Sequence, residues 1–198
     1  MPRLLPQIFA LTSVAIFLCC AQAAAAQAVT PVPKLDDEQM RGTWYEIARL
    51  PTKREKSCAG NNIEVIARGD KLNQLQLVDS CKNPKGFLNV RNVTANPQKK
   101  KQNNGDGRLK ITTIWPMSLK YWVLAVDPNY QWSLIGTPNH RFLWIYARTP
   151  TLDPTTLSTI NNIATSQGFA TAKLLPTVQT LPPGQHPAQI ASAAPVEK

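Results

Sequence analysis

Between residues 43 and 148 the sequence consists of short segments of strand length, separated by residues typical of turns. Gly69-Asp70, Asn83-Pro84-Lys85-Gly86 and Asp127-Pro128-Asn129 are the clearest of these separators. Eight β-strands are predicted, over residues 43–51, 62–68, 74–81, 87–95, 108–115, 120–127, 131–136 and 141–148. Their mostly local connections favour an all-β fold, an eight-stranded antiparallel up-and-down β-barrel that can enclose one small ligand. A two-sheet sandwich is the competing architecture.

The pattern changes after residue 148 and becomes helical. Asp153 can cap a helix that begins at Pro154, and Gly168 is a natural end. Apolar residues recur between them at helical spacing, at Leu157, Ile160, Ile163 and Ala164. We therefore predict one long helix over 154–167, one helical turn within 35–41 and a short strand within 173–179.

The first 26 residues have the composition of a signal peptide. Arg3 precedes an apolar run over 8–20, and small residues follow it. We predict a linker over 27–34, a single barrel domain over 35–180 and a disordered Pro/Ala-rich tail over 181–198. The leader predicts a protein that is periplasmic or secreted after cleavage.

Four cysteines divide between the leader and the predicted domain. Cys19 and Cys20 lie in the leader, and either could carry a lipid anchor to the outer membrane. Large apolar residues rather than small ones precede them, so the anchor is the less favoured alternative. Cys58 and Cys81 are the pair left in the domain, and in an oxidising compartment they are predicted to form a disulfide.

The formal net charge is +10, which raises the question of anionic partners. The run Lys99-Lys100-Lys101 could suggest nucleic-acid binding. A lysine loop is usually only solvated, and an export signal argues against that partner. We predict that the protein has no nucleic-acid partner. We also predict that it associates with an anionic membrane surface.

A glycine and an aromatic residue open the first predicted strand. Gly42 permits a tight entry, and Trp44 can plug one end of a barrel. Arg148 ends the last predicted strand, so on barrel closure it can stack on Trp44 as a cation–π pair. We predict structural roles for these three residues.

Three short motifs, in order, resemble the signatures of the lipocalin family. They are Gly42-Thr43-Trp44, Asp127-Pro128-Asn129-Tyr130 (with Val126 in place of a threonine) and Arg148-Thr149-Pro150. The residues around the first and third resemble the bacterial branch, which includes outer-membrane lipoprotein lipocalins and is related to apolipoprotein D and plant temperature-induced lipocalins. The resemblance covers about 35–180. It implies a calyx that binds fatty acids or lysophospholipids for transport or storage in the envelope, without a cofactor.

Strand alternation suggests which residues line the calyx. The predicted ligand-binding residues are apolar or aromatic with few exceptions: Ile63, Val65, Leu77, Val90, Ile111, Thr113, Trp115, Tyr121, Val123, Leu134, Phe142, Trp144 and Tyr146. Ordinary core packing would give the same pattern. If Trp44 closes one end, alternate loops form the mouth, and a headgroup rim is predicted at Lys53, Arg54, Lys85 and Arg141. We expect a monomer or a weak homodimer.

An active site is hard to assemble from this sequence. His140 and His186 have no partners at ligand spacing, so no metal site is predicted. Glu46 and Asp79 could both point inward, although a buried Glu46 satisfied by its neighbours is the simpler interpretation. We predict that the protein is not an enzyme. The alternative is a lipocalin-fold isomerase or lipid-modifying enzyme acting on an apolar substrate.

Overall fold

The computed structural model describes residues 27–52, 57–71, 74–98, 105–114 and 117–180. The predicted signal peptide over 1–26 and the predicted tail over 181–198 lie outside the described residues. So do three predicted site residues, Lys53, Arg54 and Trp115.

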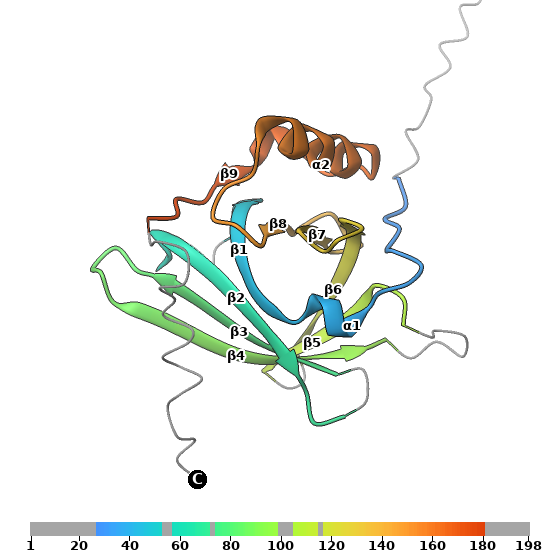
Figure 1. Cartoon of the computed structure of the whole chain (residues 1–198), viewed down its shortest axis with the longest axis horizontal. Helices are drawn as coiled ribbons and strands as arrows, with labels where there is room; N and C mark the ends of the chain where they lie inside the picture. The colour runs from blue at the N-terminus through green and yellow to red at the C-terminus, as the bar shows by residue number, and fades with distance from the viewer. Residues whose placement is uncertain (1–26, 53–56, 72–73, 99–104, 115–116, 181–198) are drawn as a thin grey trace, which may run out of the picture.

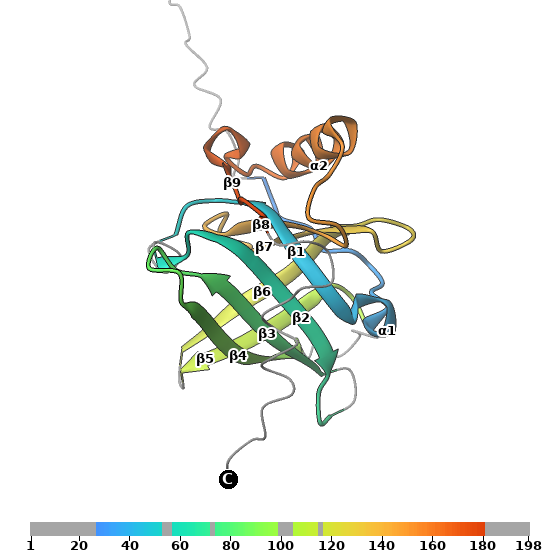
Figure 2. The ribbon, with the colours of Figure 1, turned by 60° about the vertical axis from the view of Figure 1, so that its left-hand side comes forward.

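Eight antiparallel strands form a closed barrel, as Figures 1 and 2 show. They are β1 (Gly42–Arg49), β2 (Gly60–Arg68), β3 (Leu75–Lys82), β4 (Leu88–Pro97), β5 (Arg108–Ile114), β6 (Met117–Val126), β7 (Trp132–Gly136) and β8 (Leu143–Ala147). Each strand pairs with the next in sequence, and β8 pairs with β1. The predicted barrel is therefore confirmed, and only the strand ends differ by a few residues.

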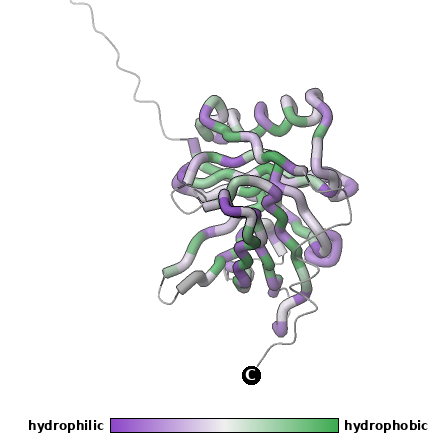
Figure 3. Tube along the Cα trace, turned by 90° about the vertical axis from the view of Figure 1, so that its left-hand side faces the viewer, coloured by the Kyte–Doolittle hydropathy of each residue, from purple (hydrophilic) through white to green (hydrophobic). Residues whose placement is uncertain are grey.

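The long helix α2 (Pro154–Ser166) covers one side of the barrel from outside (Figure 1). Asp153 caps it by accepting a hydrogen bond from the Thr156 amide at 2.9 Å. Ile160 and Ala164 are fully buried against the outer face of β7 and β8. In Figure 3 hydrophobic stretches run along the strands beneath this helix. No helix in the described part of the chain is long and apolar enough to cross a membrane.

Trp44 closes one end of the barrel, next to the short helix α1 (Asp37–Met40). Its ring is fully buried, and its Nε1 donates to the Met40 carbonyl at 2.7 Å. The Arg148 guanidinium lies 3.7 Å from the ring centroid. Gly42 has φ 101°, and a Cβ there would lie 3.2 Å from Arg148 Nη1. The predicted contact is thus present, and it explains why a glycine precedes the indole.

Arg148, which follows the last barrel strand β8, also forms hydrogen bonds with residues near the start of the first strand β1. Its guanidinium donates to four backbone carbonyls, those of Gln39, Arg41, Thr43 and Tyr130. These bonds join the start of β1, the end of α1 and the turn before β7. An arginine fork suits this cluster of acceptors better than a lysine would.

The wall between β1 and β2 is completed by a segment from far along the chain. The two strands pair only between Gly42 and Tyr45 on the β1 side. Beyond that point residues 175–180, here called the C-terminal strap, enter the gap; their first two residues form β9 (Leu175–Pro176). The strap bonds to both strands: Thr177 N to Ile47 O at 2.9 Å, Asn61 N to Val178 O at 2.8 Å, and Gln179 Nε2 to the carbonyls of Glu46 and Asn62, each at 2.9 Å.

Candidate functional site

A cavity of about 580 Å³ occupies the half of the barrel away from Trp44. Its lining includes residues of the β1–β2 and β7–β8 connections, the first residues of β6 and the facing ends of β3 and β4. These are the connections expected at the mouth when Trp44 closes the other end. The predicted direction of the barrel is therefore confirmed.

One wall of the cavity is apolar and aromatic. Phe142 stacks on Trp144, with planes 5° apart and centroids 5.7 Å apart, and Tyr121 lies 6.1 Å from Trp144. Ile111 and Leu119 extend this surface from β5 and β6. At the mouth the Arg141 guanidinium lies 5.4 Å from the Phe142 ring. This side of the cavity can take an aliphatic chain and offers a cation at its entrance.

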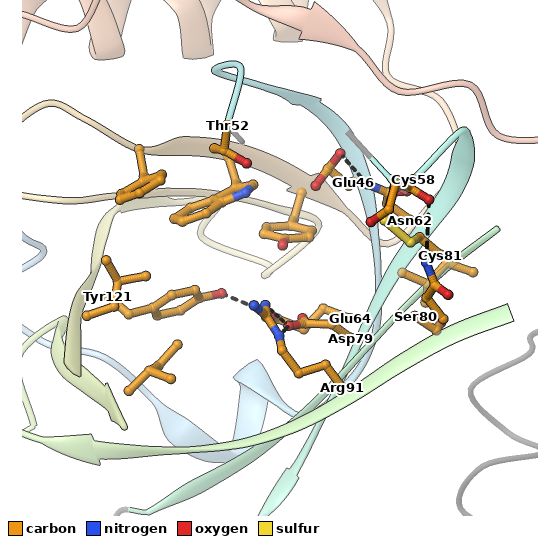
Figure 4. A pocket seen from close by; sticks show the side chains of 18 of the residues that line it. Glu46, Thr52, Cys58, Asn62, Glu64, Asp79, Ser80, Cys81, Arg91 and Tyr121 are labelled. Atoms are coloured by element: carbon orange, nitrogen blue, oxygen red, sulfur yellow. Dashed lines mark hydrogen bonds and ion pairs between the residues drawn. A yellow bond between two sulfur atoms is a disulfide. The ribbon is translucent and has the colours of Figure 1, made fainter. Parts of the chain in front are cut away.

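The opposite wall carries a buried carboxyl that the sequence analysis did not identify. Glu64 is only 3% exposed and accepts a hydrogen bond from the Tyr121 hydroxyl at 2.7 Å (Figure 4). Burial raises the pKa of Glu64 well above its usual value, and the nearby Asp79 raises it further. Asp79 is itself paired with Arg91, whose Nε lies 2.9 Å away. Glu64 therefore favours its uncharged form.

Burial also raises the pKa of Tyr121 and Tyr146 well above the usual value for a phenol, with Glu64 adding to both shifts. Both hydroxyls consequently stay protonated and can act as donors. Together with Glu64 they place a hydrogen-bonding layer across the barrel.

A second polar cluster surrounds Glu46 at the gap between β1 and β2. Its carboxylate accepts from Arg49 Nη1 at 2.7 Å, from Asn62 Nδ2 at 3.0 Å and from the Thr177 hydroxyl of the C-terminal strap. Glu46 and Asp79 therefore belong to separate clusters, each with its own arginine. This arrangement matches the expectation of a satisfied Glu46 and gives no carboxylate pair for acid–base chemistry between these two residues.

The predicted disulfide between Cys58 and Cys81 is present, with the two Cα atoms 5.5 Å apart. Both cysteines line the cavity. The bond fixes the β1–β2 connection to the end of β3, at the rim of the mouth.

Seven of the thirteen residues predicted for the calyx line the cavity. They are Ile63, Val90, Ile111, Tyr121, Phe142, Trp144 and Tyr146. Thr113 lies in β5, and Trp115 lies outside the described residues. The remaining four lie elsewhere.

Leu77 and Val123 point into the barrel but pack in the solid half near Trp44, so they do not line the cavity. Leu134 packs on the outer side, beneath α2. It was assigned inward because alternation alone cannot tell a helix-covered outer face from an inner one. These three assignments to the cavity lining are wrong.

Val65 is also wrongly placed by the sequence analysis. In β2 the register pairs Trp44 with Glu64 and Thr43 with Val65. Ile66 lies with Trp44 in the interior cluster, so Glu64 and Ile66 share the inner face and Val65 has the opposite one. Alternation had assigned Ile63 and Val65 to the inner face, which leaves Glu64 on the outer one. The hydrogen bond from Tyr121 makes its burial tolerable.

The cationic rim is only partly reproduced. Arg141 lines the cavity, whereas Lys85 lies in the exposed β3–β4 turn and does not. Asn62, Glu64 and Arg91 line the cavity but were not predicted from the sequence. The Asp79–Arg91 pair could have been found from the cross-strand register of β3 and β4, which places the two residues opposite each other. Within the described residues, no three His, Cys, Asp or Glu side chains are grouped to hold a metal ion.

Comparison with known proteins gives a consistent result. The family model described as a lipocalin-like domain matches residues 35–179. The outer membrane lipoprotein Blc of Escherichia coli is 28% identical over 184 residues, covering 87% of this chain and 96% of that protein. Temperature-induced lipocalin-1 of Arabidopsis thaliana is 29% identical, covering 75% of this chain and 82% of the relative. Mouse apolipoprotein D is 29% identical, covering 73% and 77%.

Among solved structures, insecticyanin from the tobacco hornworm Manduca sexta matches with a TM-score of 0.62 at 19% identity, covering 79% of this chain and 87% of that one. Apocrustacyanin C1 matches with a TM-score of 0.60 at 14% identity, covering 85% and 97%. At these identities the structures establish the shared fold alone.

Proposed function

This chain belongs to the lipocalin-like family, and from that premise we propose that it binds a fatty acid or a lysophospholipid in its barrel cavity, as an exported carrier or store in the bacterial envelope. The family match and its relatives support the more general role of binding a small hydrophobic ligand. The cavity is what supports the narrower proposal.

The observation that carries the proposal is a cavity with an apolar aromatic wall and a cation at its mouth. About 580 Å³ lies within the usual range for a small-molecule site. Ile111, Leu119 and Trp144 offer apolar surface to an acyl chain. Each methylene buried there contributes about 0.8 kcal/mol, so a long chain binds without further chemistry. Arg141 can meet an anionic headgroup that stays at the entrance.

We propose that the protein works by binding and not by catalysis. Two carboxylates of the cavity, Glu46 and Asp79, are each paired with an arginine. Export is supported by the composition of residues 1–26, and a location at the outer membrane by the name of the Escherichia coli relative.

The test is displacement of a fluorescent fatty-acid probe from the purified protein. Palmitic acid and a lysophospholipid should both displace the probe. Arg141→Gln should weaken palmitic acid about threefold to tenfold and its uncharged methyl ester less than twofold, because only the acid carries a charge for the guanidinium.

Arg68→Gln is the matched control, because Arg68 is exposed at the far end of β2, away from the mouth. It should bind both lipids as the unmodified protein does. A probe that stays bound at saturating lipid would refute the proposed ligand class. If Arg141→Gln weakened the binding of the acid and the ester equally, the proposed contact between Arg141 and the anionic headgroup would be wrong.

A further inference from the structure

The cavity ends on a polar layer and not on the apolar core. On four strands the residues that line its deepest part are Glu64, Asp79, Arg91 and Tyr121. The next inward residues toward Trp44 are apolar, buried and outside the cavity lining: Ile66, Leu77, Val93 and Val123. Figure 4 shows Tyr121 reaching from β6 across the barrel toward Glu64. This layer, here called the polar floor, is what the buried end of a ligand meets.

The charges of the polar floor already balance. Asp79 is paired with Arg91, and burial keeps Glu64 uncharged. A charged group brought down to this layer would be desolvated without a counter-charge. A methyl end pressed against it would desolvate polar groups and return no hydrogen bond. The floor therefore suits a neutral group that can donate and accept.

Two polar groups on this side of the cavity have capacity left for such a ligand. Asn62 is 7% exposed and lines the cavity, and its Oδ1 is buried without a hydrogen-bond partner among the described residues. Arg91 engages Asp79 through Nε and Nη2, it lines the cavity, and 44% of its side chain is exposed. Arg91 thus offers a donor edge to the cavity, and Asn62 Oδ1 lies just behind the lining as an acceptor whose hydrogen-bonding capacity is unused.

We propose that the polar floor is a subsite for a hydroxyl group at the far end of the bound chain, so that acyl chains with a terminal hydroxyl are preferred over plain ones. The inference rests on the proposed function, because it takes the acid group to stay at Arg141 and the chain end to reach the floor. It narrows the ligand class from fatty acids to terminally hydroxylated fatty acids.

The test compares three acids of equal length by probe displacement from the full unmodified protein. 16-Hydroxypalmitic acid should bind about twofold to tenfold tighter than palmitic acid, which is what one net hydrogen bond contributes. 2-Hydroxypalmitic acid should bind no tighter than palmitic acid, because its hydroxyl stays beside the headgroup. Equal or weaker binding of the 16-hydroxy acid overturns the subsite while leaving fatty-acid binding intact. Failure of all three acids to bind overturns the proposed function and the subsite together.

The double variant Asp79→Leu/Arg91→Met replaces the ion pair with apolar side chains and should reverse the preference toward palmitic acid. The matched control is Asp106→Leu/Arg108→Met, which removes another Asp–Arg pair, at the start of β5 and outside the cavity lining. The control should keep the ratio of the unmodified protein. A double variant at 79 and 91 that still prefers the 16-hydroxy acid contradicts the proposal. If this variant does not fold, the comparison of 16-hydroxypalmitic acid with palmitic acid on the unmodified protein still tests the hydroxyl subsite.

Discussion

Glu64 shows how one side chain can be both costly to bury and useful in its place. The groups that face it are Tyr121, Asp79, Arg91 and Tyr146, with Glu46 in the neighbouring cluster. Tyr121 donates to it, whereas Asp79 repels its charged form. The result is an acid group that holds its proton inside the folded barrel.

This state predicts a pH dependence of stability. Burial raises the folded-state pKa of Glu64 well above the ordinary glutamate value of 4.5, so the folded protein keeps a proton that the unfolded chain releases as the pH rises past 4.5. The contribution of Glu64 to the free energy of unfolding should therefore be greatest below that pH and should be lost as the pH rises toward the folded-state pKa. The slope from this one group approaches about 1.4 kcal/mol per pH unit.

Glu64→Gln should flatten this part of the curve, because glutamine still accepts from Tyr121 but does not titrate. Urea unfolding at a series of pH values measures it. Asp70→Asn, in an exposed turn, serves as the control and should leave the slope unchanged. A slope that is identical in Glu64→Gln and the unmodified protein would show that another group is responsible.

At the level of single residues, sequence reasoning succeeded where one chemical property decides position. Trp44 and Arg148 were predicted to be in contact because a guanidinium stacks favourably on the face of an indole ring. Cys58 and Cys81 were paired by compartment and elimination. The burial of Glu64 was not predicted because it depends on the Tyr121 hydroxyl, 57 residues away. No local feature of the sequence indicates that Tyr121 is its partner.

Among the elements, the C-terminal strap is the one whose role the sequence did not predict. A short strand was expected within 173–179, and β9 occupies two residues of it. The rest of the strap bonds through side chains as well as backbone, so no alternation of apolar residues marks it. The barrel strands were predictable for the opposite reason, because turn residues and alternation define each of them locally.

Gln179→Leu tests whether the strap holds the wall between β1 and β2. The change removes both hydrogen bonds from Gln179 Nε2, to Glu46 O and Asn62 O. It should lower the free energy of unfolding by about 1–2 kcal/mol and speed hydrogen exchange at the Asn61 amide, which donates to the strap.

Gln39→Leu is the control for this change. Gln39 is exposed in α1 at the closed end, and its side chain bonds only to Asp36 among the described residues. Asn61 should exchange there at its normal rate. Unchanged exchange in Gln179→Leu would mean that the strap lies on the wall without holding it.

For the whole molecule, the disulfide links the mouth of the cavity to overall stability. Cys58 and Cys81 are separated by 23 residues, so the bond restricts a loop of that length in the unfolded chain. Replacing both cysteines with alanine should lower the free energy of unfolding by about 3 kcal/mol. Urea unfolding of the oxidised protein, the reduced protein and the double variant measures this effect.

The reduced protein and the double variant should unfold at similar urea concentrations, both below the oxidised form. If reduction leaves the midpoint where it was, the bond constrains a loop that is already ordered without it. The fold and the closed end could be predicted from local pattern, as could the apolar part of the cavity wall. The polar part around Glu64 could not, because it depends on contacts between distant strands.

The strap also has a consequence for how the protein is made. Residues 175–180 complete the wall between two strands that begin at Gly42 and Gly60, so a nascent chain cannot finish its barrel while the strap is still inside the ribosome. Contacts this distant in sequence form late and slowly. The wall can be completed only after all of residues 175–180 have been synthesised and released, and until then the β1–β2 edges stay open to chaperones or to unwanted pairing.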